Sequence, residues 1–145
     1  MAKALHNFDP NEIAEAVLRG MDRGLSRLAL TLQTTIKVSI SGAGTGIRYP
    51  RSLRRSSRPG EPPAKQTGDL SRSWQASPNR IATGRRLGYR IGSNKKYAAA
   101  LEYGTARIDA RPYVQPAIDK IAPEAVKILG DYVNEQIRKL NLGRL

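Results

Sequence analysis

Cysteine is missing from this chain of 145 residues, and histidine occurs only once, as His6. Without cysteine there is no disulfide scaffold, no thiol nucleophile and no cysteine-ligated zinc site. A single histidine excludes histidine-based metal sites and Ser/His triads as well. We therefore expect neither a catalytic site nor a metal, and we expect no cofactor.

Long hydrophobic runs are also missing. The most apolar stretch, residues 25–40, is interrupted by Arg27, Gln33 and Lys37, whereas a membrane span needs about 20 apolar residues. The first ten residues, MAKALHNFDP, lack the apolar core of an export signal. We expect no membrane contact, and a protein that stays in the cytoplasm of the cell that makes it until it is assembled.

Acidic residues are scarce in the middle of the chain. The whole sequence has 25 Lys and Arg against 12 Asp and Glu, a net charge of +13. Residues 48–96 hold 13 of the basic residues against only Glu61 and Asp69, whereas residues 1–47 and 97–145 each have a net charge of +1. A local excess of this size indicates a polyanionic partner or an acidic protein surface, and says nothing about the fold.

The densest positive charge lies in a segment that is rich in glycine and proline, residues 41–66. This composition disfavours both helix and central strand, so we predict an extended loop or arm. Two interpretations stay open: a solvated loop, or an arm that becomes ordered against a partner, with arginine suited to phosphate and carboxylate. The arginines of this arm are Arg48, Arg51, Arg54, Arg55 and Arg58.

The flanking sequences predict two long helices. Asp9 and Pro10 supply a cap and a first-turn proline for a helix over residues 10–40. Its apolar stripe consists of Ile13, Val17, Met21, Leu25, Leu28, Leu32 and Ile36. Gly20 and Gly24 either weaken this helix or allow a neighbouring element to approach closely. A second long helix is predicted over residues 114–141, with a kink or a restart at Pro123.

Between these helices the pattern predicts a β-hairpin or small sheet over residues 67–92. One strand runs from Ser73 to about Ala82 and is broken by Pro78, and the other covers residues 86–92. A short helix is expected over residues 95–104, because Gly104 stands where a helix C-terminal glycine belongs. The fold class is therefore α+β, in a single domain that spans residues 1–145.

No catalytic template fits the chain. The GAGTG segment at 42–46 lacks the preceding strand and the Lys-Ser/Thr ending of a phosphate loop, so a loop hinge explains it better. Glu102 is the only acid between Asp69 and Asp109. We expect its carboxylate to be held by backbone N–H groups or by an arginine, and a lone catalytic glutamate is the weaker alternative.

Three motifs, in this order, resemble the neck proteins of long-tailed bacteriophages, the ring-forming head–tail joining, tail-completion and minor tail component family. They are PGEPPAKQTGDLSRSW (59–74), YAAALEYGT (97–105) and ARPYVQPAID (110–119), and the resemblance covers about residues 10–140. The arginine density of residues 48–58 departs from the family pattern. The motif positions are Thr67, Gly68, Leu70, Ser73, Tyr97, Ala98, Glu102, Gly104, Thr105, Pro112, Tyr113 and Pro116.

Each motif suggests a mechanical role. Thr67 and Gly68 would turn the arm back into the sheet, with Leu70 as the first buried anchor. Gly104 would end the short helix in a left-handed conformation, and Tyr113 would pack into the core.

The resemblance implies a structural virion protein rather than an enzyme. It would form a homo-oligomeric ring of six or twelve copies in the phage neck, between the portal or connector and the tail, with genomic DNA passing through. Host cytoplasm would be its location during assembly. The alternative from the residues alone is a free basic nucleic-acid-binding protein that contacts phosphates through Arg48–Arg58.

Overall fold

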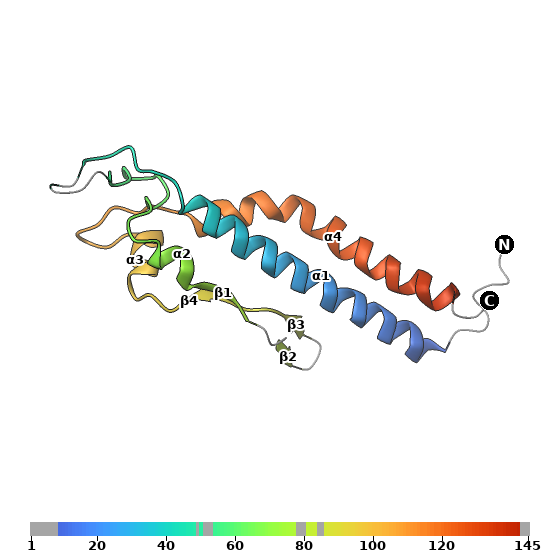
Figure 1. Cartoon of the computed structure of the whole chain (residues 1–145). Coiled ribbons are helices and arrows are strands. Elements are labelled where there is room, and N and C mark those ends of the chain that lie inside the picture. The colour runs from blue at the N-terminus through green and yellow to red at the C-terminus, as the bar shows by residue number, and fades with distance from the viewer. Residues whose placement is uncertain (1–8, 49, 51–53, 78–80, 84–85, 143–145) are drawn as a thin grey trace.

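Two long antiparallel helices form the frame of the molecule, and a layer of short strands, short helices and loops packs against one part of them (Figure 1). The computed structural model describes residues 9–48, 50, 54–77, 81–83 and 86–142. The elements are α1 (Pro10–Ser39), α2 (Asp69–Ser73), β1 (Trp74–Ala76), β2 (Ile81–Thr83), β3 (Arg86–Gly88), β4 (Ile91–Ser93), α3 (Tyr97–Tyr103) and α4 (Val114–Leu142). This is the α+β class that the sequence predicts.

The molecule has two unlike ends. Figure 1 places α2, α3 and the segment between α1 and α2 at one end of the helix pair. We call residues 41–68 the arm and this end of the molecule the arm end. The opposite end consists of residues 10–24 of α1 and 129–142 of α4, and we call it the far end.

Helix α1 begins as predicted. The Asp9 carboxylate accepts a hydrogen bond from the Asn11 amide at 2.9 Å, and Pro10 occupies the first turn. The buried face differs from the predicted stripe, because most of the large apolar residues are only half-buried. The fully buried positions are small apart from one isoleucine: Ala16, Gly20, Gly24, Ala29 and Ile36.

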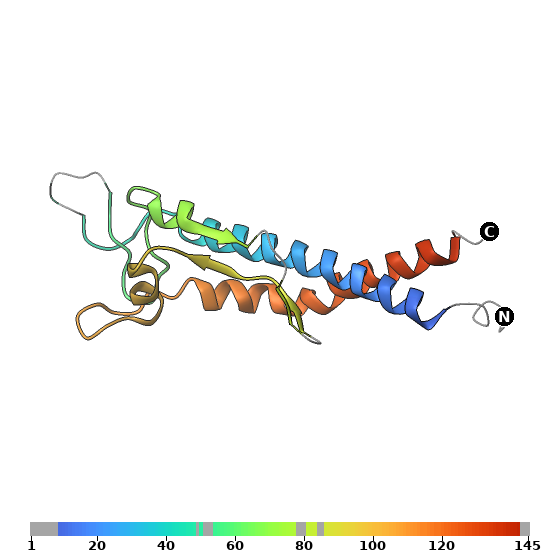
Figure 2. The same ribbon diagram turned by 90° about the horizontal axis from the view of Figure 1, so that it is seen from below.

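Small residues bring the two helices together at the far end. A Cβ atom on Gly20 would lie 2.5 Å from Val133 Cα, and one on Gly24 would lie 2.8 Å from Leu129 Cδ2. The close approach that the two glycines suggested is therefore confirmed. Figure 2 shows that the helices cross, with α4 passing from one side of α1 to the other along its length.

Helix α4 continues through Pro123 without a restart, contrary to one of the two sequence expectations for this position. Pro123 is exposed, so its ring sits on the solvent side of the helix. The missing backbone hydrogen bond of a proline can then be tolerated there without ending the helix.

The strands are shorter than predicted. Each expected strand is interrupted, so the hairpin consists of two separate antiparallel ladders, β1 with β4 and β2 with β3. Proline cannot donate to a ladder, and Pro78 stands in the interval between β1 and β2. Pro78 itself and residues 84–85, between β2 and β3, lie outside the described residues. In the interval between β3 and β4, the Tyr89 hydroxyl donates a hydrogen bond to Asp22 of α1 at 3.1 Å.

Helix α2 was not predicted, because five residues are too few to show a helical period. It lies where the sequence predicted only a turn into the sheet. Leu70 is half-buried in it and packs against the core, which consists of Ile36, Ile40, Trp74, Tyr113 and Ala117. The core therefore lies toward the arm end of the helix pair.

Candidate functional site

The arm is held together by its own backbone. The Gly46 amide donates to the Ser56 carbonyl at 2.8 Å, the Ser56 amide donates to Ile47 at 2.9 Å, and residues 48 and 55 form an antiparallel bridge. At the base, the Lys65 amide donates to the Gly42 carbonyl at 2.9 Å. The arm is thus a folded loop with internal order, and neither of the two interpretations drawn from composition anticipated this.

Four of the five predicted arginines are exposed on the arm: Arg48, Arg54, Arg55 and Arg58. Arg51 lies outside the described residues. Arg55 donates through its guanidinium to the Gly46 carbonyl at 3.2 Å, so one of these cations also closes the loop. The arm therefore presents a group of positive charges at one end of the molecule.

The acid of the arm, Glu61, is used internally. Its carboxylate accepts hydrogen bonds from the Thr45 hydroxyl and from the Arg58 amide, the latter at 2.9 Å. These two contacts, with the Thr45 hydroxyl first, lower the pKa of Glu61. Glu61 therefore links Thr45 and Arg58, which lie in two separate parts of the arm.

Glu102 is buried and caps the start of α4. One carboxylate oxygen accepts the amides of Tyr113 at 2.8 Å and Val114 at 2.9 Å, and the other accepts the Gln115 amide at 3.0 Å. The first amides of a helix have no partner within it, and a negative charge is favourable at that end. The expectation that backbone N–H groups hold this carboxylate is confirmed.

Tyr113 is fully buried beside this cap. Its ring meets Trp74 edge to face, with centroids 5.7 Å apart, and its hydroxyl donates to the Ala98 carbonyl at 3.2 Å. Burial raises the pKa of Tyr113 to about 12. The second and third motifs, which contain Ala98 and Tyr113, are therefore joined through a buried hydrogen bond.

Gly104 ends α3 with a positive φ of 75°, but its ψ of 177° is extended, so the predicted left-handed helical conformation is not the one adopted. A Cβ atom here would lie 2.9 Å from the Ala110 amide nitrogen and 3.0 Å from the Ile108 carbonyl oxygen. The Thr105 hydroxyl accepts from the Arg107 and Ile108 amides. The loop between α3 and α4 therefore folds back tightly on the end of α3.

The first motif is fixed by side-chain hydrogen bonds. Thr67 donates to the Asp69 carboxylate at 2.7 Å, and Arg72 pairs with the same carboxylate. The Thr67 hydroxyl and then the Arg72 guanidinium lower the pKa of Asp69. Ser73 shares a hydrogen bond of 2.6 Å with Ser93 of β4, so this motif is tied to the sheet.

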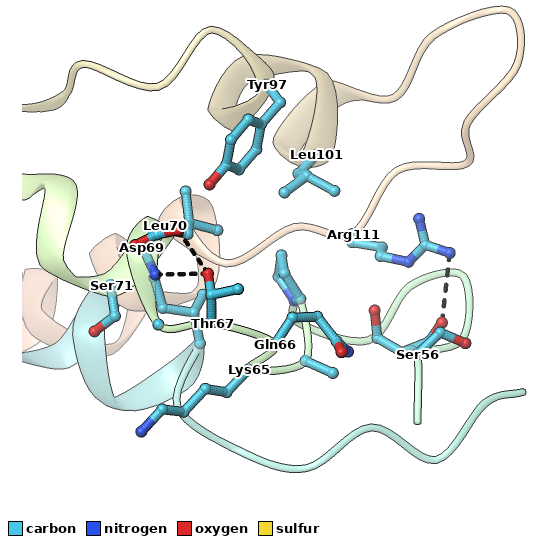
Figure 3. Close-up of a pocket in the computed structure, with 15 residues that line it drawn as sticks. Ser56, Lys65, Gln66, Thr67, Asp69, Leu70, Ser71, Tyr97, Leu101 and Arg111 are labelled. Atoms are coloured by element: carbon cyan, nitrogen blue, oxygen red, sulfur yellow. Dashed lines mark hydrogen bonds between the residues drawn. The ribbon is translucent and has the colours of Figure 1, made fainter. Parts of the chain in front are cut away.

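These three motifs meet around one pocket of about 200 Å³ (Figure 3). In Figure 3, Tyr97 and Leu101 of α3 lie on one side of the pocket, Gln66 and Thr67 lie on the other, and Arg111 lies at one end. Pro112 and Pro116, of the same third motif, are not among the lining residues. The convergence could not be predicted from the sequence, because it depends on how α2, α3 and the third motif pack.

Arg111 lines this pocket, and the sequence motif that contains it gave no role to this residue. Its amide donates to the Leu101 carbonyl at 2.7 Å, and its guanidinium reaches the Ser57 carbonyl at 3.4 Å. The Nε atom is buried and has no hydrogen-bond partner among the described residues. Arg111 stands inside the ARPY sequence of the third motif, and that position was the one available signal.

Within the described part of the chain, no group of acidic residues and histidine could hold a metal ion. No described helix is long and apolar enough to cross a membrane. The contacts of Glu102, Glu61 and Asp69 hold backbone and side chains in place, so what these three carboxylates do in the structure is to position segments.

Comparison with models of known protein families, with curated proteins and with solved structures finds no match for this chain.

Proposed function

We propose that this chain is a structural subunit of the neck of a long-tailed phage, where copies form a closed ring that joins the DNA-filled head to the tail. The observation that carries the proposal is the meeting of the three family-like motifs at the arm end. There Glu102, Gly104 and Tyr113 position loops and helix ends.

A ring requires each copy to present two different surfaces, one to each neighbour. The molecule offers an elongated frame with unlike ends (Figure 1), one carrying the arginine arm and the other made of two closely packed helices. In the proposed ring of six or twelve copies, the arm faces the neighbouring portal, connector or tail proteins, or DNA in the channel. The virion neck is then its final location.

Light scattering of the purified chain during size-exclusion chromatography tests this proposal. A ring subunit is expected to give one oligomer of fixed mass, visible as rings by negative-stain electron microscopy. Mass spectrometry of the virions is expected to find the chain at a small, fixed copy number.

The opposite outcome is a monomer at all concentrations that binds DNA tightly, with an affinity that falls steeply with salt. That result would replace the ring by the free nucleic-acid-binding protein. A hydrolytic activity that Glu102→Gln abolishes would overturn both interpretations.

A further inference from the structure

Among the residues that the structure describes, Arg111 has no partner of opposite charge, although its guanidinium is partly buried. Its side chain is half-buried, its Nε atom is shielded from solvent, and no described carboxylate forms an ion pair with it. The hydrogen bond that its side chain donates to the Ser57 carbonyl is long, at 3.4 Å. A partly desolvated guanidinium without a counter-charge is unfavourable, so the site is incomplete as it stands.

Three acids near the arm do not pair with Arg111, because each is engaged elsewhere. Asp69 is held by Thr67 and Arg72, and Glu61 by Thr45 and the Arg58 amide. Glu102 is turned toward the start of α4. Asp109, in the same loop, is exposed and forms no ion pair with Arg111. The described residues therefore leave the guanidinium open to a carboxylate from a partner.

The pocket walls define what else the ligand must carry. Apolar side chains cover much of the wall, with Ile40, Leu70 and Leu101 among them, and Lys65 adds a second cation at the rim. From these walls and Arg111 we infer that the pocket takes a peptide segment of a partner protein in which a carboxylate side chain lies next to an aliphatic one. The carboxylate pairs with the Arg111 guanidinium, and the aliphatic group fills the apolar part.

A nucleic-acid backbone fits these features less well. A phosphate would satisfy Arg111, but it would bring no apolar group to the pocket wall that Ile40, Leu70 and Leu101 form. The exposed arginines of the arm are the better phosphate site, because they lie on the surface. A planar guanidinium in a pocket suits a carboxylate, which it can bind with two parallel hydrogen bonds.

This inference deepens the proposed assembly role by naming the chemistry of the partner, and it rests on that role. The probe is the peptide acetyl-Ala-Leu-Glu-Leu-Ala-amide, added to the full-length ¹⁵N-labelled chain and followed by NMR. We expect it to shift the Nε–H signal of Arg111 and the amide signals of Thr67 and Leu101. The matched peptide with glutamine in place of glutamate, and the one with alanine in place of both leucines, are each expected to bind about tenfold more weakly or worse.

Protein variants distinguish binding at this pocket from a general effect of positive charge. Arg111→Gln is expected to weaken peptide binding about tenfold or more, and its melting temperature is expected to stay within about 3 °C of the parent. Arg107→Gln removes an equal charge from an exposed position in the same loop and is the control that should bind normally. Two results together would make Arg111 a structural residue only. The melting temperature of Arg111→Gln would fall by much more than about 3 °C, and the Arg111 signals of the parent would not change when peptide is added.

Three further outcomes would each overturn the inference: equal binding of the glutamine peptide, equal binding by Arg111→Gln, or displacement of the peptide by a short DNA duplex or inorganic phosphate at lower concentration. The two proposals fail separately. Rings without peptide binding would contradict the pocket inference alone, and peptide binding by a permanent monomer would contradict the assembly role alone.

Discussion

The two ends of the helix pair are stabilised in different ways. At the far end, α1 and α4 approach each other closely at Gly20, which faces the backbone of Val133, and at Gly24, which faces the Leu129 side chain. At the arm end, Trp74 and Tyr113 fill the space between elements, and the Glu102 carboxylate holds the start of α4. The far end depends on the lack of side chains at Gly20 and Gly24, whereas the arm end depends on the hydrogen bonds of the Glu102 carboxylate. The two ends should therefore fail under different substitutions.

Adding one methyl group at the far end should have the largest effect. In Gly20→Ala the new Cβ would lie 2.5 Å from Val133 Cα and 2.9 Å from the Tyr132 carbonyl oxygen, so the helices must separate. We expect the free energy of unfolding to fall by more than about 3 kcal/mol. Urea denaturation followed by circular dichroism measures this loss.

Gly130→Ala is the matched control on α4, because a Cβ there has no heavy atom within 4 Å. Alanine is the better helix former, so this variant should be more stable than the parent by about 0.5–1 kcal/mol. Equal effects of both variants would show that helix propensity, and not close approach, decides the stability of the far end.

Removing the cap at the arm end should have the next largest effect. Glu102→Ala leaves the amides of Tyr113, Val114 and Gln115 without their acceptor, and we expect a loss of about 3 kcal/mol. Glu102→Gln keeps one acceptor oxygen and should lose about half as much. Glu124→Ala, at an exposed position of the same helix, should change stability by less than about 0.5 kcal/mol. Wild-type stability in Glu102→Ala would refute the capping role.

The arm end should also respond to alkaline pH through Tyr113. Its folded pKa of about 12 lies above the ordinary value of 10.0, so the folded state holds this proton more tightly than the unfolded chain. Stability is then unaffected by this group below about pH 10 and falls as the pH rises toward 12, by about 2 kcal/mol. Equilibrium unfolding at a series of pH values measures the slope, and Tyr113→Phe should make it shallower. The same slope in Tyr113→Phe would assign it to other groups.

The sequence predicts the far end better than it predicts the arm end. Periodicity and capping residues locate α1 and α4 within one or two residues of the observed bounds, because such signals are local. Periodicity misplaces the centre of the buried face, since it counts large apolar side chains, and the tightest contacts are made by Gly20 and Gly24.

At the arm end the decisive contacts join residues that are far apart in the chain. The carboxylate of Glu102 could be expected to find backbone N–H groups, because it is a lone acid among apolar residues. That these are the amides of residues 113–115 follows only from the fold. The pocket beside Arg111 could not be predicted from the sequence for the same reason. Helix α2 could not be predicted because five residues are too few to show a helical period.

Replacing the arm arginines should have the smallest effect on folding. The replacement tests whether the arm end contributes to function as well as to stability. Replacing Arg48, Arg51, Arg54, Arg55 and Arg58 by glutamine should change the free energy of unfolding by less than about 1 kcal/mol, because the four that are described are exposed. The same change should abolish head–tail joining, measured as infectious particles in complementation, because the arm charges would no longer meet their partner.

The two long helices, away from the arm, supply a control with the same change in net charge. Arg19, Arg23, Arg27, Lys127 and Arg138 are exposed on α1 and α4, and their replacement by glutamine should leave particle assembly intact. If both variants lose assembly to the same degree, net charge and not the arm is what matters. If neither does, the arginines have no part in joining. Only loss confined to the arm variant supports a division of the molecule into a far end that holds the helices together and an arm end that meets a partner.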